Sequence, residues 1–179
     1  MYSITHPVNV LKFCPQCGSS HFPAIGNRSF LCENCHFNYY VNSSAAVAVL
    51  LFNSKGELLL TRRAFEPYIG KLDLPGGFID LMETGEQAAV REIHEELGIS
   101  IHTLQYFGSY PNEYIFSGFS VFTLDIAYLA KSENLNEMKP MDDVASFEFH
   151  KPENVDFDEL PSKSMKNIIK DLIKREGTY

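Results

Sequence analysis

The sequence contains no tryptophan and no long apolar run. Its longest apolar stretch, residues 45–52, has the length of one strand, whereas a membrane-spanning helix needs about 20 such residues. The first thirteen residues lack a basic region followed by an apolar core, so we expect no signal peptide. These absences predict a cytoplasmic protein that does not associate with a membrane.

Basic residues are also scarce. Lys and Arg number 15 against 23 Asp and Glu, which gives a net charge of −8. Such a balance argues against a protein that coats nucleic acid through its phosphates, because that mode of binding needs a basic face. With 45% hydrophobic and 21% charged residues, the chain can bury a core, and its length of 179 residues suits one domain with a small appendage.

Cysteine is absent from the last 144 residues, because all four cysteines lie between positions 14 and 35. They form two Cys-x-x-Cys pairs separated by 14 residues, a spacing that directs four thiolates at one tetrahedral zinc ion. Disulfides or a redox Cys-x-x-Cys are the alternatives, and a reducing cytoplasm disfavours the former. We therefore predict a zinc ribbon over residues 1–41, before a larger domain over 42–179. The predicted zinc ligands are Cys14, Cys17, Cys32 and Cys35.

Zinc ribbons often bind nucleic acid or protein, but this segment carries few charges. Lys12, Arg28 and Glu33 give residues 1–41 a net charge of +1, which is a weak electrostatic attraction for nucleic acid. We therefore expect a structural or dimer-forming role for the ribbon, and no nucleic-acid partner.

A helix is predicted over residues 85–97. Thr84 and Gln87 have the spacing of a capping box, and Gly98 is a typical residue after a helix end. At 100° per residue, three glutamates share one sector of about 100° beside an apolar stripe. A solvated acidic face is one interpretation of that sector, and an oxygen-ligand site for Mg²⁺ or Mn²⁺ is the other. The glutamates are Glu92, Glu95 and Glu96, and the predicted core positions are Ala89, Val90, Ile93 and Leu97.

The spacing around this helix resembles the signature of the Nudix hydrolases at every fixed position. Gly77 is followed after five residues by Glu83, and after seven more by the run Arg91-Glu-Ile-His-Glu-Glu-Leu-Gly-Ile99. The upstream run Leu74-Pro-Gly-Gly77 also resembles the loop that leads into this signature. Leu72 and Met82 depart from residues common in the family, but they lie outside the fixed positions.

The resemblance implies a fold and a set of roles. The fold is an α/β/α sandwich around a mixed sheet, preceded here by the small zinc-ribbon module. The remaining sequence allows it, with strand-like runs at 45–52, 57–62, 103–109, 119–129 and 145–150 and an amphipathic helix at 162–175. By resemblance, Glu83 holds Arg91, and the Mg²⁺ ligands are the carbonyl of Gly76 with Glu92, Glu95 and Glu96.

The implied reaction is attack of water on a diphosphate that links a nucleoside to another group. Glu92 is the first candidate for the proton acceptor, with Asp142, Asp143 and Glu113 as alternatives on loops. A nucleotide-sensing regulator that uses the ribbon to contact nucleic acid or protein is the competing function. The intact set of glutamates favours the enzyme.

A ribbon placed before such a domain resembles the NADH pyrophosphatase arrangement. The Ser-Gln-Pro-Trp-Pro-Phe-Pro motif of that group is absent, so NADH, FAD and ADP-ribose all stay open as substrates. The resemblance also allows a homodimer. Two arginines could contact phosphates, or they could simply lie on a surface strand. Three aromatic residues could stack on a purine ring, or they could pack in the core or in a dimer interface. These five residues are Arg62, Arg63, Tyr110, Tyr114 and Phe116.

Overall fold

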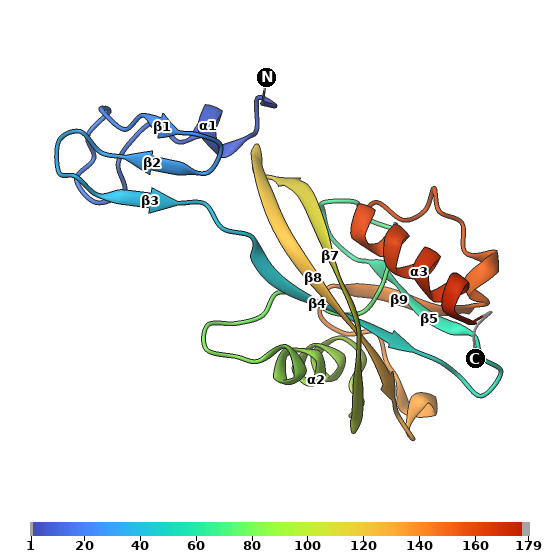
Figure 1. Ribbon diagram of the computed structural model, residues 1–179. Coiled ribbons are helices and arrows are strands. Elements are labelled where there is room, and N and C mark those ends of the chain that lie inside the picture. Colours follow the sequence, from blue (N-terminus) through green and yellow to red (C-terminus); the bar gives the residue numbers. More distant parts are fainter. Residues whose placement is uncertain (1, 177–179) are drawn as a thin grey trace. The chain divides into compact units, whose positions relative to one another are not determined.

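The computed structural model describes residues 2–176, which form two structural units (Figure 1). The first unit combines the chain up to residue 43 with residues 113–122, and the second combines residues 44–112 with the chain from residue 123 onward. A segment from the middle of the sequence therefore belongs to the N-terminal unit.

The first unit is a small antiparallel sheet with a core of aromatic rings and cysteines. Its strands pair in the order β1-β2-β3, and the rings of Phe22 and Phe30 stack with centroids 5.1 Å apart. The two chain segments of this unit are linked at Thr5, because the Thr5 carbonyl accepts a 2.8 Å hydrogen bond from the Ser120 N–H. The elements are α1 (Pro7–Val10), β1 (Ala24–Ile25), β2 (Ser29–Leu31) and β3 (Asn38–Tyr40).

The second unit contains two three-stranded sheets. One has the order β4-β8-β7, with β4 (Ser44–Leu51) parallel to β8 (Phe119–Lys131). A two-residue turn with positive φ at Ser117 and Gly118 joins β7 (Thr103–Phe116) to β8, as a tight hairpin requires, and this end of the hairpin, residues 113–122, is counted in the first unit. The other sheet is antiparallel and has the order β6-β5-β9. Its strands are β6 (Leu72–Asp73), β5 (Leu58–Arg63) and β9 (Val144–His150), and the connections include the short helices η1 (Leu135–Glu137) and η2 (Pro152–Asn154).

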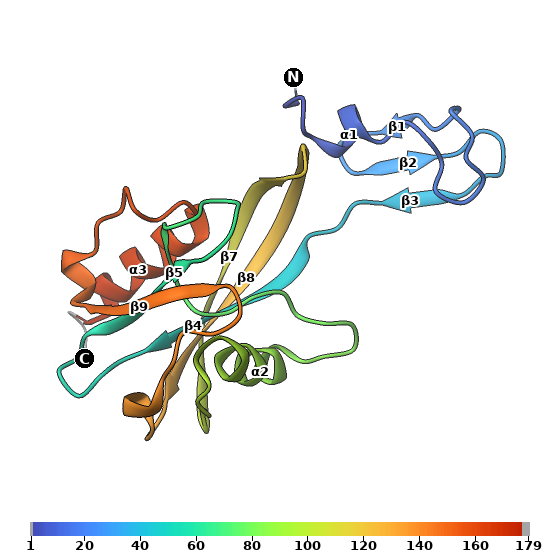
Figure 2. The ribbon, with the colours of Figure 1, turned by 180° about the vertical axis from the view of Figure 1, so that it is seen from behind.

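Two helices cover the two faces of these sheets (Figures 1 and 2). Alternate residues of β4 face opposite ways, so Val47, Val49 and Leu51 pack with α2 (Gly85–Leu97). Ala48 and Leu50 pack with α3 (Lys163–Glu176) instead. This arrangement confirms the predicted α/β/α sandwich with a mixed sheet.

The predicted elements match the structure closely, with two differences. Strand β7 continues seven residues beyond its predicted end at 109, because pairing with β8 keeps the chain extended through Pro111. Helical periodicity predicts Val90 on the core stripe of α2, but Val90 is 39% exposed, while Glu96 is only 5% exposed. The buried face of α2 is therefore rotated toward its acidic residues.

The helices are too short or too polar to span a membrane: across residues 2–176, none combines the length and the apolar character that crossing requires.

Candidate active site

Helix α2 begins and ends at the predicted residues, which fixes the register of its glutamates. The Thr84 hydroxyl accepts a hydrogen bond from the Gln87 N–H, and the Gln87 side chain accepts one from the Thr84 N–H. Gly98 adopts φ +68° and ends the helix through a hydrogen bond from its N–H to the carbonyl of His94.

Arg91 is the centre of the largest polar group on this helix. Its guanidinium donates to both carboxylate oxygens of Glu83 at 2.9 Å, to Glu92 at 2.8 Å and to Glu95 at 2.9 Å. It also donates to the Phe78 carbonyl at 3.0 Å. Hydrogen bonds from Arg91 hold the pKa of Glu83 below its ordinary value. Arg91 thus ties the loop before α2 to the helix.

Glu96 points away from this group and into the protein. Its side chain accepts a 3.0 Å hydrogen bond from the Gly76 N–H, and the residue is 5% exposed. Burial raises the pKa of Glu96 well above its ordinary value, and the negative charge of Asp143 raises it further. Burial also raises the pKa of Glu92, against the lowering effect of Arg91. Two glutamates of α2 are therefore poorly solvated acids close to the Gly76 loop.

The two glycines of this loop cannot carry a side chain in the present geometry. Gly76 has φ +138°, and a Cβ on it would lie 2.2 Å from the carbonyl oxygen of Val47. A Cβ on Gly77 would lie 2.6 Å from the Glu92 carboxylate. The loop can approach both β4 and the acids of α2 because these side chains are missing.

Further acidic and basic residues lie around Gly76 and Glu96. A small cavity is lined by residues from β5, β6, α2 and the segment before β9. Arg63 pairs with Asp73 there at 2.9 Å, and burial raises the pKa of Asp73 to about 6. Asp73 directly precedes the Leu74-Pro-Gly-Gly77 run, a position that could have drawn attention to it in the sequence. The lining residues are Thr61, Arg63, Asp73, Leu74, Gly76, Glu96, Asp143 and Val144.

The candidate proton acceptors lie in different places. Asp143 lines the acidic cavity and acts on the pKa of both Glu92 and Glu96, whereas its neighbour Asp142 is exposed with φ +50°. Glu113 is an exposed residue of β7 in the first unit. The structure thus brings Asp143 and Glu92 together at one site.

The five candidate substrate residues already have structural surroundings. Arg62 pairs with Glu148 at 2.6 Å and with Glu159 at 3.1 Å, while Arg63 pairs with Asp73. Tyr110 lies in the core against α3, as the alternative interpretation has it, and its hydroxyl donates to Asp171 at 3.2 Å. The remaining two, half-buried Tyr114 and exposed Phe116, belong to the first unit.

The four cysteines form a compact cluster in the first unit. Their sulfur atoms all lie within 4.8 Å of one another, with 3.7 Å between Cys14 and Cys35 and 3.6 Å between Cys17 and Cys32. Ligands placed about 2.3 Å from a tetrahedral zinc ion would be separated by about 3.8 Å, so this geometry could hold such an ion. A hydrogen bond from the Ser19 backbone is the largest cause that lowers the pKa of Cys17 to about 6.

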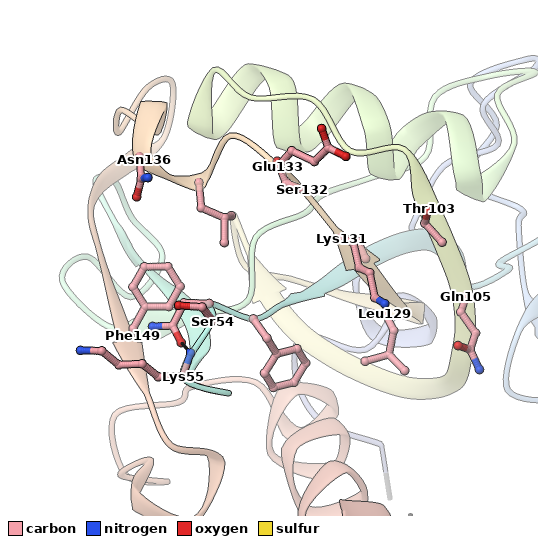
Figure 3. Close-up of a pocket in the computed structure, with 14 residues that line it drawn as sticks. Ser54, Lys55, Thr103, Gln105, Leu129, Lys131, Ser132, Glu133, Asn136 and Phe149 are labelled. Carbon is pink, nitrogen blue, oxygen red and sulfur yellow. Dashed lines mark hydrogen bonds between the residues drawn. The ribbon is translucent and has the colours of Figure 1, made fainter.

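A larger cavity, of about 830 Å³, lies elsewhere in the second unit (Figure 3). It is bounded by the β4–β5 turn, the start of β7, the end of β8 and the end of β9, and Leu129 and Phe149 contribute apolar surface. None of the predicted site residues lines it. Chemically, the acidic group beside Gly76 is the better candidate for an active site.

The acidic group has the chemistry of a site for a hard divalent cation. All its candidate ligands are oxygen atoms, which Mg²⁺ and Mn²⁺ prefer. Glu96 is a buried carboxylate that accepts a hydrogen bond from the Gly76 N–H and is affected by the negative charge of Asp143. The close approach of Gly77 to Glu92 would not survive a Cβ. The residues therefore fit such an ion.

The fold and this site define a class of protein. A family model described as the NUDIX domain matches residues 42–175. The chain therefore belongs to the Nudix hydrolase family, and the resemblance carried by Gly77, Glu83 and residues 91–99 is confirmed.

Curated relatives add a more particular similarity. The chain is 34% identical over 109 residues to the NAD-capped RNA hydrolase NudC of Haemophilus influenzae strain PittGG, covering 60% of this chain and 41% of the relative. It is 31% identical over 106 residues to NudC of Vibrio parahaemolyticus, covering 59% and 40% respectively. The chain thus spans about two fifths of the length of the curated relatives that it matches.

A solved structure supports the fold. The crystal structure of a NUDIX hydrolase from Nitrosomonas europaea superposes with a TM-score of 0.69 at 24% identity. The match covers 94% of this chain and 93% of the other.

Proposed function

We propose that this protein hydrolyses a diphosphate that links a nucleoside to another group, with Mg²⁺ or Mn²⁺ as its cofactor. The observation that carries the proposal is the poorly solvated pair Glu92 and Glu96 on α2, packed beside a glycine loop that has no room for side chains. Such buried acids are costly in the absence of a cation, and an enzyme that acts on diphosphates needs cations at this point.

The proposed roles follow the predicted residues. Glu92, Glu95, Glu96 and the Gly76 carbonyl would hold the metal ion, which would neutralise the diphosphate and lower the pKa of the attacking water. Glu83 and Arg91 orient the helix, because Arg91 links the Phe78–Glu83 loop to the acids of α2. Glu92 is the first candidate for the proton acceptor, and Asp143 is the alternative that lies beside it in the structure.

A second proposed cofactor is structural. Cys14, Cys17, Cys32 and Cys35 would bind one zinc ion and stabilise the ribbon over residues 1–41, ahead of the catalytic domain over 42–179. The sulfur separations of 3.6 and 3.7 Å support this proposal. A segment this small buries too little surface to fold alone, so zinc binding would contribute directly to its stability.

The names of the curated relatives support a dinucleotide as the substrate in this proposal. Their name describes the hydrolysis of an RNA capped with a dinucleotide, so a dinucleotide such as NADH or FAD, or a related diphosphate such as ADP-ribose, is the expected substrate.

An assay of turnover tests the proposal. Purified protein is given Mg²⁺ with NADH, FAD, ADP-ribose, a diadenosine polyphosphate and nucleoside triphosphates in turn, and the products are resolved. We expect cleavage within the diphosphate of at least one of the first three, and none after chelation of Mg²⁺. Saturable binding without cleavage of any compound would contradict the proposal and favour a nucleotide sensor.

A further inference from the structure

The loop between β5 and β6, residues 64–71, exposes three large apolar side chains. Phe65 is 62% exposed, Tyr68 is 44% exposed and Ile69 is 59% exposed. One exposed apolar residue is ordinary on a protein surface, but three within five residues concentrate exposed apolar surface on one short loop, which suits a ligand.

The backbone of this loop is held firmly although its side chains are exposed. Arg63 donates from Nε to the Pro67 carbonyl at 2.8 Å, and the Arg63 carbonyl accepts from the Gly70 N–H at 2.9 Å. The Tyr68 carbonyl accepts from the Lys71 N–H at 3.0 Å. Tyr68 itself has φ +69°, which is uncommon for a bulky residue and recurs at functional sites. The aromatic rings are thus presented on a preorganised support.

The same loop begins at the wall of the acidic cavity. Arg63 and Asp143 both line that cavity together with Glu96, and the Ala64 N–H donates to the Asp143 carbonyl at 2.7 Å. Phe65 follows Arg63 by two residues, so its Cα lies within about 7 Å of that of Arg63. A ligand with its phosphates at the acidic site would therefore have this loop beside it.

We propose that Phe65 and Tyr68 form the platform on which the nucleobase of the diphosphate substrate stacks. The proposal rests on the proposed function for the position of the phosphates. A flat aromatic base gains from burying exposed aromatic rings and from ring stacking, and neither gain requires a hydrogen-bonding partner in the protein. Tyr110 is another candidate for stacking on the base, but its side chain is buried. The loop would supply the ring contact in its place.

The absence of tryptophan makes a direct test of binding simple. Tyr68→Trp places a single fluorescent reporter in the loop, and Tyr106→Trp places a matched one on β7, where Tyr106 is 59% exposed. With Mg²⁺ present, AMP should change the emission of Tyr68→Trp saturably, ribose 5-phosphate should not, and Tyr106→Trp should respond to neither. An equal response of both reporters, or none at position 68, would overturn the platform.

Turnover gives a second and independent readout. The double variant Phe65→Ala, Tyr68→Ala should raise KM for the cleaved dinucleotide by at least about tenfold and leave kcat within about twofold, because stacking contributes to binding rather than to chemistry. Ile25→Ala is the control, since Ile25 is an apolar residue that is 54% exposed on β1 of the first unit. An unchanged KM with an active wild type would contradict the platform alone. A saturable response of Tyr68→Trp to AMP in a protein that cleaves no diphosphate would contradict the proposed function alone.

Discussion

The cysteine cluster and the acidic group on α2 differ in how far their candidate ligands converge. The four sulfur atoms lie within 4.8 Å of one another, at separations suited to a tetrahedral ion. The carboxylates of Glu92 and Glu95 instead accept hydrogen bonds from Arg91, and Glu96 accepts one from Gly76. One cluster is arranged for a ligand in advance, whereas the other distributes its acids among protein partners.

This difference matches two kinds of metal site. A structural ion is bound permanently, so the polypeptide folds around its ligands. A catalytic ion that arrives with a phosphate needs ligands that stay partly open and are supported by neighbouring residues. The hydrogen bonds from Arg91 would give the acids of α2 that support. The comparison predicts that changes at the acids alter activity more than folding, and that changes at the cysteines do the reverse.

The largest expected effect comes from Glu95→Gln or Glu96→Gln. Either change should lower turnover at least ~100-fold with little loss of stability, because an electrostatic contact to the reacting charge is removed while the shape is kept. Turnover and thermal unfolding of each variant check this, with Glu86→Gln, an exposed residue in the first turn of α2, as the control. Near-normal turnover of both variants would remove α2 from the proposed active site.

Arg91→Ala should have the next largest effect. Loss of a residue that supports metal ligands typically reduces metal affinity or activity by roughly 10–100-fold. Arg91 contacts Glu83, Glu92 and Glu95, so its loss should also leave Glu83 without its main partner. Titration of turnover with Mg²⁺ should show a higher half-saturating concentration. If the Mg²⁺ dependence of Arg91→Ala matched that of the wild type, Arg91 would have no supporting role.

Gly77→Ala should lower activity by about tenfold, because a new Cβ would displace the Glu92 carboxylate and small misplacements of reacting groups are costly. The end of a side chain can move, so folding should persist. Gly76→Ala should instead destabilise the fold, since its Cβ would meet the backbone of Val47 and φ is +138°. Melting temperatures of the two variants distinguish these effects. If both variants lost the same stability, the two glycines would not differ in the way proposed here.

The smallest expected effect concerns pH. Glu92 and Glu96 have raised pKa values in the folded protein, so the folded state binds more protons than the unfolded state. The metal-free protein should therefore lose stability as pH rises above the ordinary glutamate pKa of about 4.5. The lowered pKa of Glu83 contributes in the opposite direction, with stability lost as pH falls.

Thermal unfolding of the wild type and Glu96→Gln at pH 5 and pH 8 isolates the contribution of Glu96. The wild type should lose more stability than the variant on going to pH 8, and Mg²⁺ should restore part of that loss. If the melting temperatures of both proteins changed equally between pH 5 and pH 8, the Glu96 carboxyl would not have a raised pKa in the folded protein.

Much of the fold, and the position of the candidate site residues along α2, could be predicted from the sequence, because the signals are local. The caps at Thr84 and Gly98 fix the register of α2, and the spacing of its glutamates follows from that register. The burial of Glu96 and the exposure of Val90 depend on how α2 rotates against β4, which helical periodicity alone does not determine. The local signals thus specify the helix, while packing decides which acids are buried.

Contacts between segments far apart in the chain could not be predicted from the sequence. Arg63 looked like a phosphate-binding residue, but its pairing with Asp73 depends on β5 lying beside β6. Asp143 reaches the acids of α2 because β9 pairs with β5 and places the preceding loop there. Tyr110 became a core residue because α3 covers β7. Each of these outcomes requires tertiary packing between residues far apart in the chain.

Metal content and metal dependence, measured on one preparation, test the central claim most directly. After dialysis against metal-free buffer, we expect one zinc ion per chain, no bound magnesium, and turnover of the substrate dinucleotide that returns fully when Mg²⁺ alone is added. A dialysed protein without zinc, or turnover that Mg²⁺ fails to restore, would contradict the account of one permanent and one recruited metal site.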